Sequence, residues 1–132
     1  MSFRDVGAVA DEIRMFERAW ADAAGFVGLL RESKNPGKEA HDFCAKVREI
    51  SSLQNKTAVK RWGANSSDYI RMAGWMKFMA NWLDRCHAFA NLLGMHARDE
   101  MYLTGAASLM GLLHTFSQTI SLALPEIQEE TV

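Results

Sequence analysis

The stretch MYLTGAASLMGLLHTFSQTISLALP, from Met101 to Pro125, contains no charged residue. In the whole chain of 132 residues, 23% are charged. A helix built from this stretch has no charged face to turn toward water, and such a helix is normally enclosed on most of its sides. A small bundle of four helices rarely surrounds one of its own members. The stretch therefore points to a second chain, and so to assembly.

Working outward, the apolar residues repeat every three or four positions throughout the chain, which is the pattern of helices. We expect four helices, at residues 3–32, 36–62, 67–93 and 99–124. Asn35 followed by Pro36 is typical of a helix start, and Gly63 suits a helix end. The second helix loses its regular pattern at residues 51–55, which predicts a kink or short break. Whether the third and fourth helices are continuous through Gly94 stays open.

These lengths, with short connections, predict an all-α fold: an antiparallel four-helix bundle that forms one domain over residues 1–132. We expect residues 126–132, which include three glutamates, to be a flexible acidic tail. The first helix carries an unbroken apolar seam at heptad spacing, expected to face the bundle core. The seam consists of Val6, Val9, Ile13, Phe16, Trp20, Ala23, Val27 and Leu30.

The charge-free stretch is long enough to span a bilayer. Its serine, threonine, glutamine and histidine side chains weaken insertion, and no basic cluster flanks either end, so we expect no membrane span. Cys44 and Cys86 lie beside apolar helix positions, which favours buried free thiols over a disulfide framework. Charged residues from Arg4 onward interrupt any signal-peptide core. A cytoplasmic location is therefore expected.

Two surfaces are candidates for contact with a second copy of the chain or with a different partner, and the alternative for both is burial within the single bundle. The fourth helix carries a stripe of mostly small residues opposite its large apolar seam, so another backbone can approach closely. The third helix carries an aromatic stripe beside its core seam, wider than the roughly 100° that one bundle core needs. We expect Gly111→Leu to disrupt the assembly. The candidate interface residues are Thr104, Ala107, Gly111, Thr115, Gln118, Trp75, Phe78, Trp82 and Phe89.

No catalytic, cofactor-binding or metal-binding arrangement emerges from the sequence. Metal sites in helical bundles use Glu-x-x-His pairs, and this chain contains none. It offers two other carboxylate–imidazole pairs, Asp84 with His87 and His96 with Asp99 or Glu100, which cannot fill a coordination sphere. Cys86 precedes His87, but adjacent residues of a helix point about 100° apart. The glycines are scattered and form no phosphate-binding loop. We therefore expect a protein that is not an enzyme and holds no cofactor or metal.

The basic residues are concentrated in residues 34–62, which hold seven basic and three acidic side chains, although the whole chain has a net charge of -1. Basic residues beside an aromatic ring can hold a phosphate backbone and stack a base. The acidic residues of the same helix dilute this field. The candidate nucleic-acid contacts are Lys46, Lys56, Lys60, Arg61 and Trp62.

The sequence thus favours a non-enzymatic assembly or adapter subunit that works through protein–protein contacts. Its expected partner is itself, as a homodimer, with another protein as a further partner. The alternative is a small nucleic-acid-binding accessory subunit that uses the basic face of the second helix. A second alternative is a bundle with a ligand or metal pocket near His87. Fold alone does not choose among them.

Overall fold

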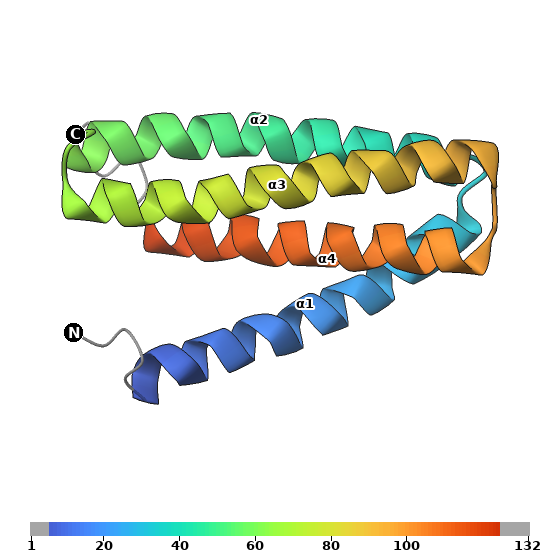
Figure 1. Cartoon of the computed structure of the whole chain (residues 1–132), viewed down its shortest axis with the longest axis horizontal. Coiled ribbons are helices and arrows are strands. Elements are labelled where there is room, and N and C mark those ends of the chain that lie inside the picture. Colours follow the sequence, from blue (N-terminus) through green and yellow to red (C-terminus); the bar gives the residue numbers. More distant parts are fainter. Residues whose placement is uncertain (1–5, 125–132) are drawn as a thin grey trace.

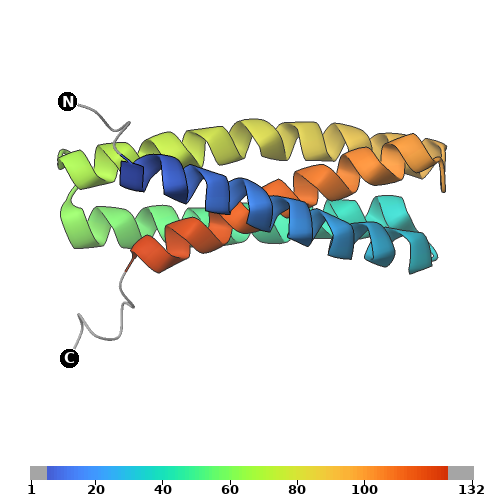
Figure 2. The same ribbon diagram turned by 90° about the horizontal axis from the view of Figure 1, so that it is seen from below.

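The computed structural model describes the backbone of residues 6–124 and the side chains of residues 13–124. Its four helices are α1 (Val6–Glu32), α2 (Pro36–Trp62), α3 (Ser67–Met95) and α4 (Glu100–Ala123), and successive helices run antiparallel (Figures 1 and 2). The predicted all-α antiparallel four-helix bundle is confirmed, with helix ends within a few residues of those expected. Predicted helical residues 3–5 and the predicted acidic tail lie outside the described residues.

The helix ends follow the local signals in the sequence. The side chain of Asn35 accepts a hydrogen bond of 3.1 Å from the amide of Lys38, and Pro36 occupies the first turn of α2. Gly63 ends this helix with a φ of 81°, a left-handed conformation that glycine adopts without strain. Ser66 caps α3 in the same way as Asn35 caps α2. These caps fix the short connection that returns the chain antiparallel.

The third and fourth helices are separate. α3 passes through Gly94 to Met95, and the following loop contains Arg98 at a φ of 72°. The guanidinium of Arg98 donates hydrogen bonds to the carbonyls of Arg31 and Ser33, the second at 2.6 Å. Carbonyls at a helix C-terminus have no partner within the helix, so these bonds satisfy them. The α3–α4 loop therefore pins the C-terminal end of α1.

α2 runs without interruption, so no break occurs at residues 51–55. Gln54, in the middle of this segment, is buried and turned toward α4. Its Nε2 donates to the carbonyl of Ser117 at 2.8 Å and to the hydroxyl of Ser121 at 2.7 Å. The weak apolar pattern thus marks a polar contact between two helices. A buried amide needs such partners.

α4 is the central helix of the bundle. It packs extensively on α1 and α3 and over a smaller area on α2. Its buried large side chains fill the core, with Leu103, Met110, Leu113 and Ile120 at most 2% exposed. The charge-free stretch is therefore enclosed mainly by the other helices of its own chain, and this explains the absence of charge without a second chain.

α1 diverges from the rest of the bundle toward its N-terminus (Figure 1). It packs almost wholly on α4 and barely touches α3. Of its predicted core seam, Ala23 and Leu30 are buried at 7% and 0% exposure. Farther toward the N-terminus, Ile13, Phe16 and Trp20 are 53%, 71% and 79% exposed. The prediction that the whole seam faces the core is therefore wrong for these three residues.

Candidate functional site

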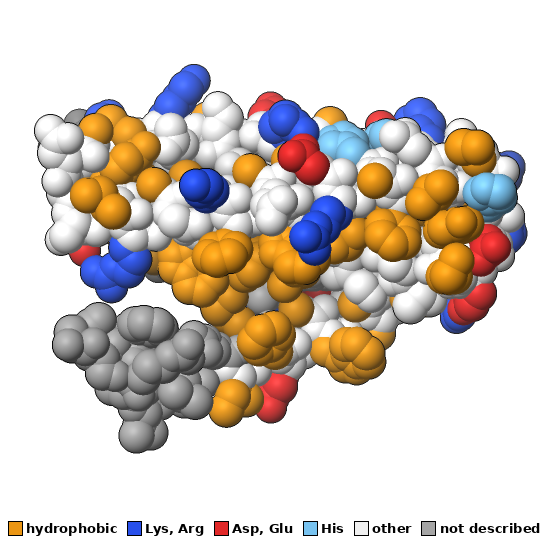
Figure 3. All heavy atoms as spheres, viewed as in Figure 1, with side chains coloured by type: hydrophobic (Ala, Val, Ile, Leu, Met, Phe, Trp, Pro, Cys, Tyr) orange, Lys and Arg blue, Asp and Glu red, His pale blue; other side chains and the backbone are white. Residues whose placement is uncertain are grey.

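An apolar hollow of about 310 Å³ opens where α1 diverges from α3. Its walls come from α1 and α3 and its floor from α4, and hydrophobic side chains gather along this part of the surface (Figure 3). Every lining residue among the described side chains is apolar. We call this hollow the α1–α3 groove; its lining residues are Met15, Phe16, Trp75, Phe78, Trp82, Leu112 and Phe116.

A row of exposed apolar side chains borders the groove. Ile13, Phe16 and Trp20 recur at intervals of three and four residues, so they lie along one side of α1. We call these three residues the α1 ridge. Phe16 belongs to both the ridge and the groove wall. Exposed apolar surface gathered in one place marks an interaction site more often than isolated exposed residues do.

The aromatic walls of the groove are held in place by contacts within the chain. The rings of Trp75 and Phe116 meet edge to face, with centroids 5.7 Å apart. The guanidinium carbon of Arg85 lies 4.5 Å from the centre of the Trp82 ring, a cation–π contact. Phe78 projects from the same side of α3 and is 62% exposed. The groove is thus already formed in the single chain.

The predicted aromatic stripe is divided between two places. Trp75, Phe78 and Trp82 meet in the α1–α3 groove. Phe89 instead packs against Tyr102 of α4, with ring centroids 6.4 Å apart, and lies over Gly105. Three of the four aromatic candidates therefore share one surface, and the fourth belongs to the α3–α4 contact.

The predicted small-residue face of α4 lies against α1. A Cβ atom added at Gly111 would stand 2.6 Å from the backbone nitrogen of Ala23 and 2.7 Å from the carbonyl oxygen of Ala19. These are backbone atoms, so Gly111 marks the close approach of two helices. Of the other candidates on this face, Ala107 and Thr115 are buried, Gln118 is half-buried and Thr104 is exposed. The place assigned from the sequence to a second chain is thus taken by α1 of the same chain.

A polar network reinforces this helix pair. The Asp22 carboxylate on α1 accepts hydrogen bonds from His114 Nδ1 and from the Thr115 hydroxyl, both at 2.9 Å. Gln118 Nε2 lies 3.2 Å from His114 Nε2 and donates to it. The sequence marks His114 as a polar anchor between helices but does not identify its partner, because Asp22 stands 92 residues before it. It fixes the middle of α1 on α4, just beyond the α1 ridge.

Two histidines meet between α2 and α3. His41 Nδ1 lies 3.2 Å from His87 Nδ1, and His41 Nε2 lies 2.8 Å from the side-chain oxygen of Asn91. His41 Nε2 donates to that oxygen, so in the neutral pair His87 Nδ1 donates to His41. Burial lowers the pKa of His87, and positive charge on His41 and Arg48 lowers it further. The pair therefore favours a neutral His87.

The two cysteines are free and fully buried, which confirms the prediction from the sequence. The pKa of Cys86 is raised by its hydrogen bond with Cys44 and by burial.

Asp84, one turn before His87, lies 4.0 Å from Arg48. In the part of the chain that the structure describes, no three His, Cys, Asp or Glu side chains are arranged to hold a metal ion.

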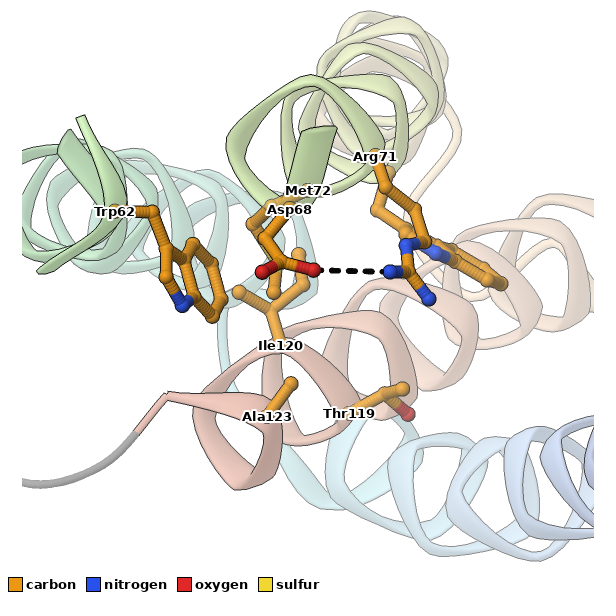
Figure 4. A pocket seen from close by; sticks show the side chains of 8 residues that line it. Trp62, Asp68, Arg71, Met72, Thr119, Ile120 and Ala123 are labelled. Atoms are coloured by element: carbon orange, nitrogen blue, oxygen red, sulfur yellow. Dashed lines mark hydrogen bonds and ion pairs between the residues drawn. The ribbon is translucent and has the colours of Figure 1, made fainter. Parts of the chain in front are cut away.

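The basic candidates lie along α2, away from the groove lining. Trp62, at the end of the helix, lines a separate hollow of about 300 Å³ (Figure 4). Asp68 and Arg71 form an ion pair of 3.0 Å in this hollow, so a carboxylate stands on the same side as the Trp62 ring. Of the other candidates, Lys46, Lys56, Lys60 and Arg61 are exposed. Nucleic-acid binding stays a prediction.

The chain matches no protein-family model, and no curated protein or solved structure is significantly similar to it. Across residues 6–124, none of the helices combines the length and hydropathy needed to cross a bilayer. Function must therefore be inferred from the described surface, where the α1–α3 groove and the α1 ridge bring exposed apolar side chains together.

Proposed function

We propose that this protein is a non-enzymatic assembly subunit that works as a homodimer, with the α1–α3 groove and the α1 ridge as its contact surface. The observation that carries this proposal is a groove whose described lining is entirely apolar, bordered by three large exposed apolar side chains. Covering such surface is favourable by roughly 25 cal/mol per Å² of apolar area. Tryptophan is also enriched among the residues that dominate binding energy.

The exposed area approaches the lower limit of the area that a specific dimer buries. A large aromatic side chain contributes ~200 Å² when fully buried. At exposures of 71%, 79% and 62%, Phe16, Trp20 and Phe78 retain most of this area. Together they offer ~400 Å² per copy and ~800 Å² over two copies. Ile13 and the half-buried groove walls raise the total toward the ~1,000 Å² of a specific interface.

The chemistry of the groove agrees with a binding role. Its described lining holds no acid, base or nucleophile, so it offers no group for proton transfer or covalent catalysis. A cytoplasmic location is part of the proposal. It is supported by Cys44 and Cys86, which are free thiols although their side chains hydrogen-bond, and a reducing compartment preserves that state.

Co-purification tests the proposal with a matched pair of variants. An affinity-tagged copy and an untagged copy are expressed together, and recovery of the untagged copy is measured. Phe78 and Ile70 both lie on α3 and are both 62% exposed, but only Phe78 lines the groove. We expect Phe78→Glu in both copies to abolish recovery and Ile70→Glu to leave it unchanged.

Two outcomes contradict the proposal. Equal recovery with both variants means that the copies associate through another face. No recovery even for the wild-type pair means that the chain does not self-associate. In that second case, stoichiometric retention of a different protein that Phe78→Glu abolishes would replace the homodimer with an adapter role.

A further inference from the structure

The exposed apolar surface contains both a projection and a hollow. The α1 ridge projects from α1, and the α1–α3 groove lies immediately beside it, since Phe16 belongs to both. In a two-fold dimer the same patch meets itself, so it must be self-complementary. A ridge next to a groove satisfies this requirement, because each copy supplies what the other lacks.

The contacts of α1 within its own chain are mainly with α4. Gly111 brings the α4 backbone against Ala19 and Ala23, and Asp22 is bound to His114 in the same region. Arg98 holds the C-terminal end of the helix. With the C-terminal half of α1 fixed in this way, its N-terminal half diverges and leaves one wall of the groove uncovered.

We infer that the α1 ridge of one copy inserts into the α1–α3 groove of a second copy, and reciprocally, so that α1 crosses the α3 of its partner. This inference rests on the proposed homodimer and specifies its geometry. Phe16 and Trp20 then pack against the partner's Trp75, Phe78 and Trp82. The lining is uncharged in the described residues, and the ridge that enters it is uncharged as well.

Cross-linking between different copies tests this geometry. Glu17 follows Phe16 on α1 and Lys77 precedes Phe78 on α3, and both charged side chains are exposed. One tagged chain carries Glu17→Cys and one untagged chain carries Lys77→Cys; the two are mixed and treated with a short bis-maleimide. Because Cys44 and Cys86 are both 0% exposed, only the introduced thiols react.

We expect a covalent product that joins the tagged chain to the untagged chain. In the control, one chain carries Lys46→Cys, on the exposed face of α2, and the other carries Lys77→Cys. We expect no cross-linked product from this pair. As a second measure, Trp20→Glu is added to both chains, and we expect it to abolish the cross-link between positions 17 and 77. Circular dichroism shows whether each variant keeps its helices.

The outcomes separate this inference from the proposed function. A dimeric wild type that gives no product between positions 17 and 77 overturns reciprocal insertion and leaves the homodimer standing. A monomeric wild type overturns both.

Discussion

Gly111→Ala tests the contact that directs α1 across the bundle. The added methyl group would stand 2.6 Å from the Ala23 backbone nitrogen and 2.9 Å from its Cα. Neither atom can rotate away as the end of a side chain does, so α1 and α4 have to separate. Forcing extra atoms into a packed interface costs about 1–3 kcal/mol of unfolding free energy.

The matched control is Gly28→Ala. Gly28 also lies within a helix, but a Cβ atom there meets nothing within 4 Å. Replacing glycine by alanine inside a helix stabilises it by roughly 1 kcal/mol, and this gain is common to both variants. We therefore expect Gly28→Ala to unfold at a higher urea concentration than wild type. The unfolding free energy of Gly111→Ala should lie ~1–3 kcal/mol below that of Gly28→Ala.

Urea titration followed by far-ultraviolet circular dichroism measures this difference. The transition midpoint should shift between the variants while the slope with denaturant stays the same. All samples need one protein concentration, since self-association makes stability depend on concentration. If Gly111→Ala is stabilised as much as Gly28→Ala, then α1 does not lie against Gly111. The small-residue face of α4 would then be available to another chain.

Two further predictions concern His87, which is half-buried, and the two buried cysteines. Because the fold lowers the pKa of His87 through burial and through positive charge on His41 and Arg48, the neutral ring is favoured. Its stabilising effect is complete above the unfolded value of about 6.5 and is lost as the pH falls through the lowered pKa. Urea titrations across this range should show stability falling with acid, and an equal slope in His87→Asn would refute the role. Native protein should leave Cys44 and Cys86 unreactive toward a chromogenic disulfide, whereas urea-unfolded protein should react at both; fast labelling of native protein would contradict their burial.

The sequence predicts that α4 is enclosed on most of its sides, but not which helix encloses it. A charge-free stretch indicates that a helix is covered on most sides. The spacing of its apolar residues is the same whether the covering helix belongs to its own chain or to another chain. Gly111 signals a close backbone approach in the same way and does not identify the backbone. The three-dimensional structure identifies α1 as the covering helix, because Ala19 and Ala23 lie against Gly111.

The α1 ridge could not be distinguished from the core by periodicity. One heptad pattern runs through both groups of residues. Ile13, Phe16 and Trp20 are exposed, whereas Ala23 and Leu30, farther along the same pattern, are buried. The divergence of α1 depends on contacts between residues far apart in the chain, which no local pattern records. The aromatic stripe of α3, by contrast, was predictable as surplus apolar surface, because a single bundle core needs a narrower face.

The molar mass of the wild-type protein in solution tests the central claim most directly. Sedimentation equilibrium over a range of concentrations measures it without a tag or a substitution. Self-association through the α1–α3 groove predicts a species of twice the 14.8 kDa chain mass that dissociates on dilution. A mass of 14.8 kDa at every concentration would contradict the claim.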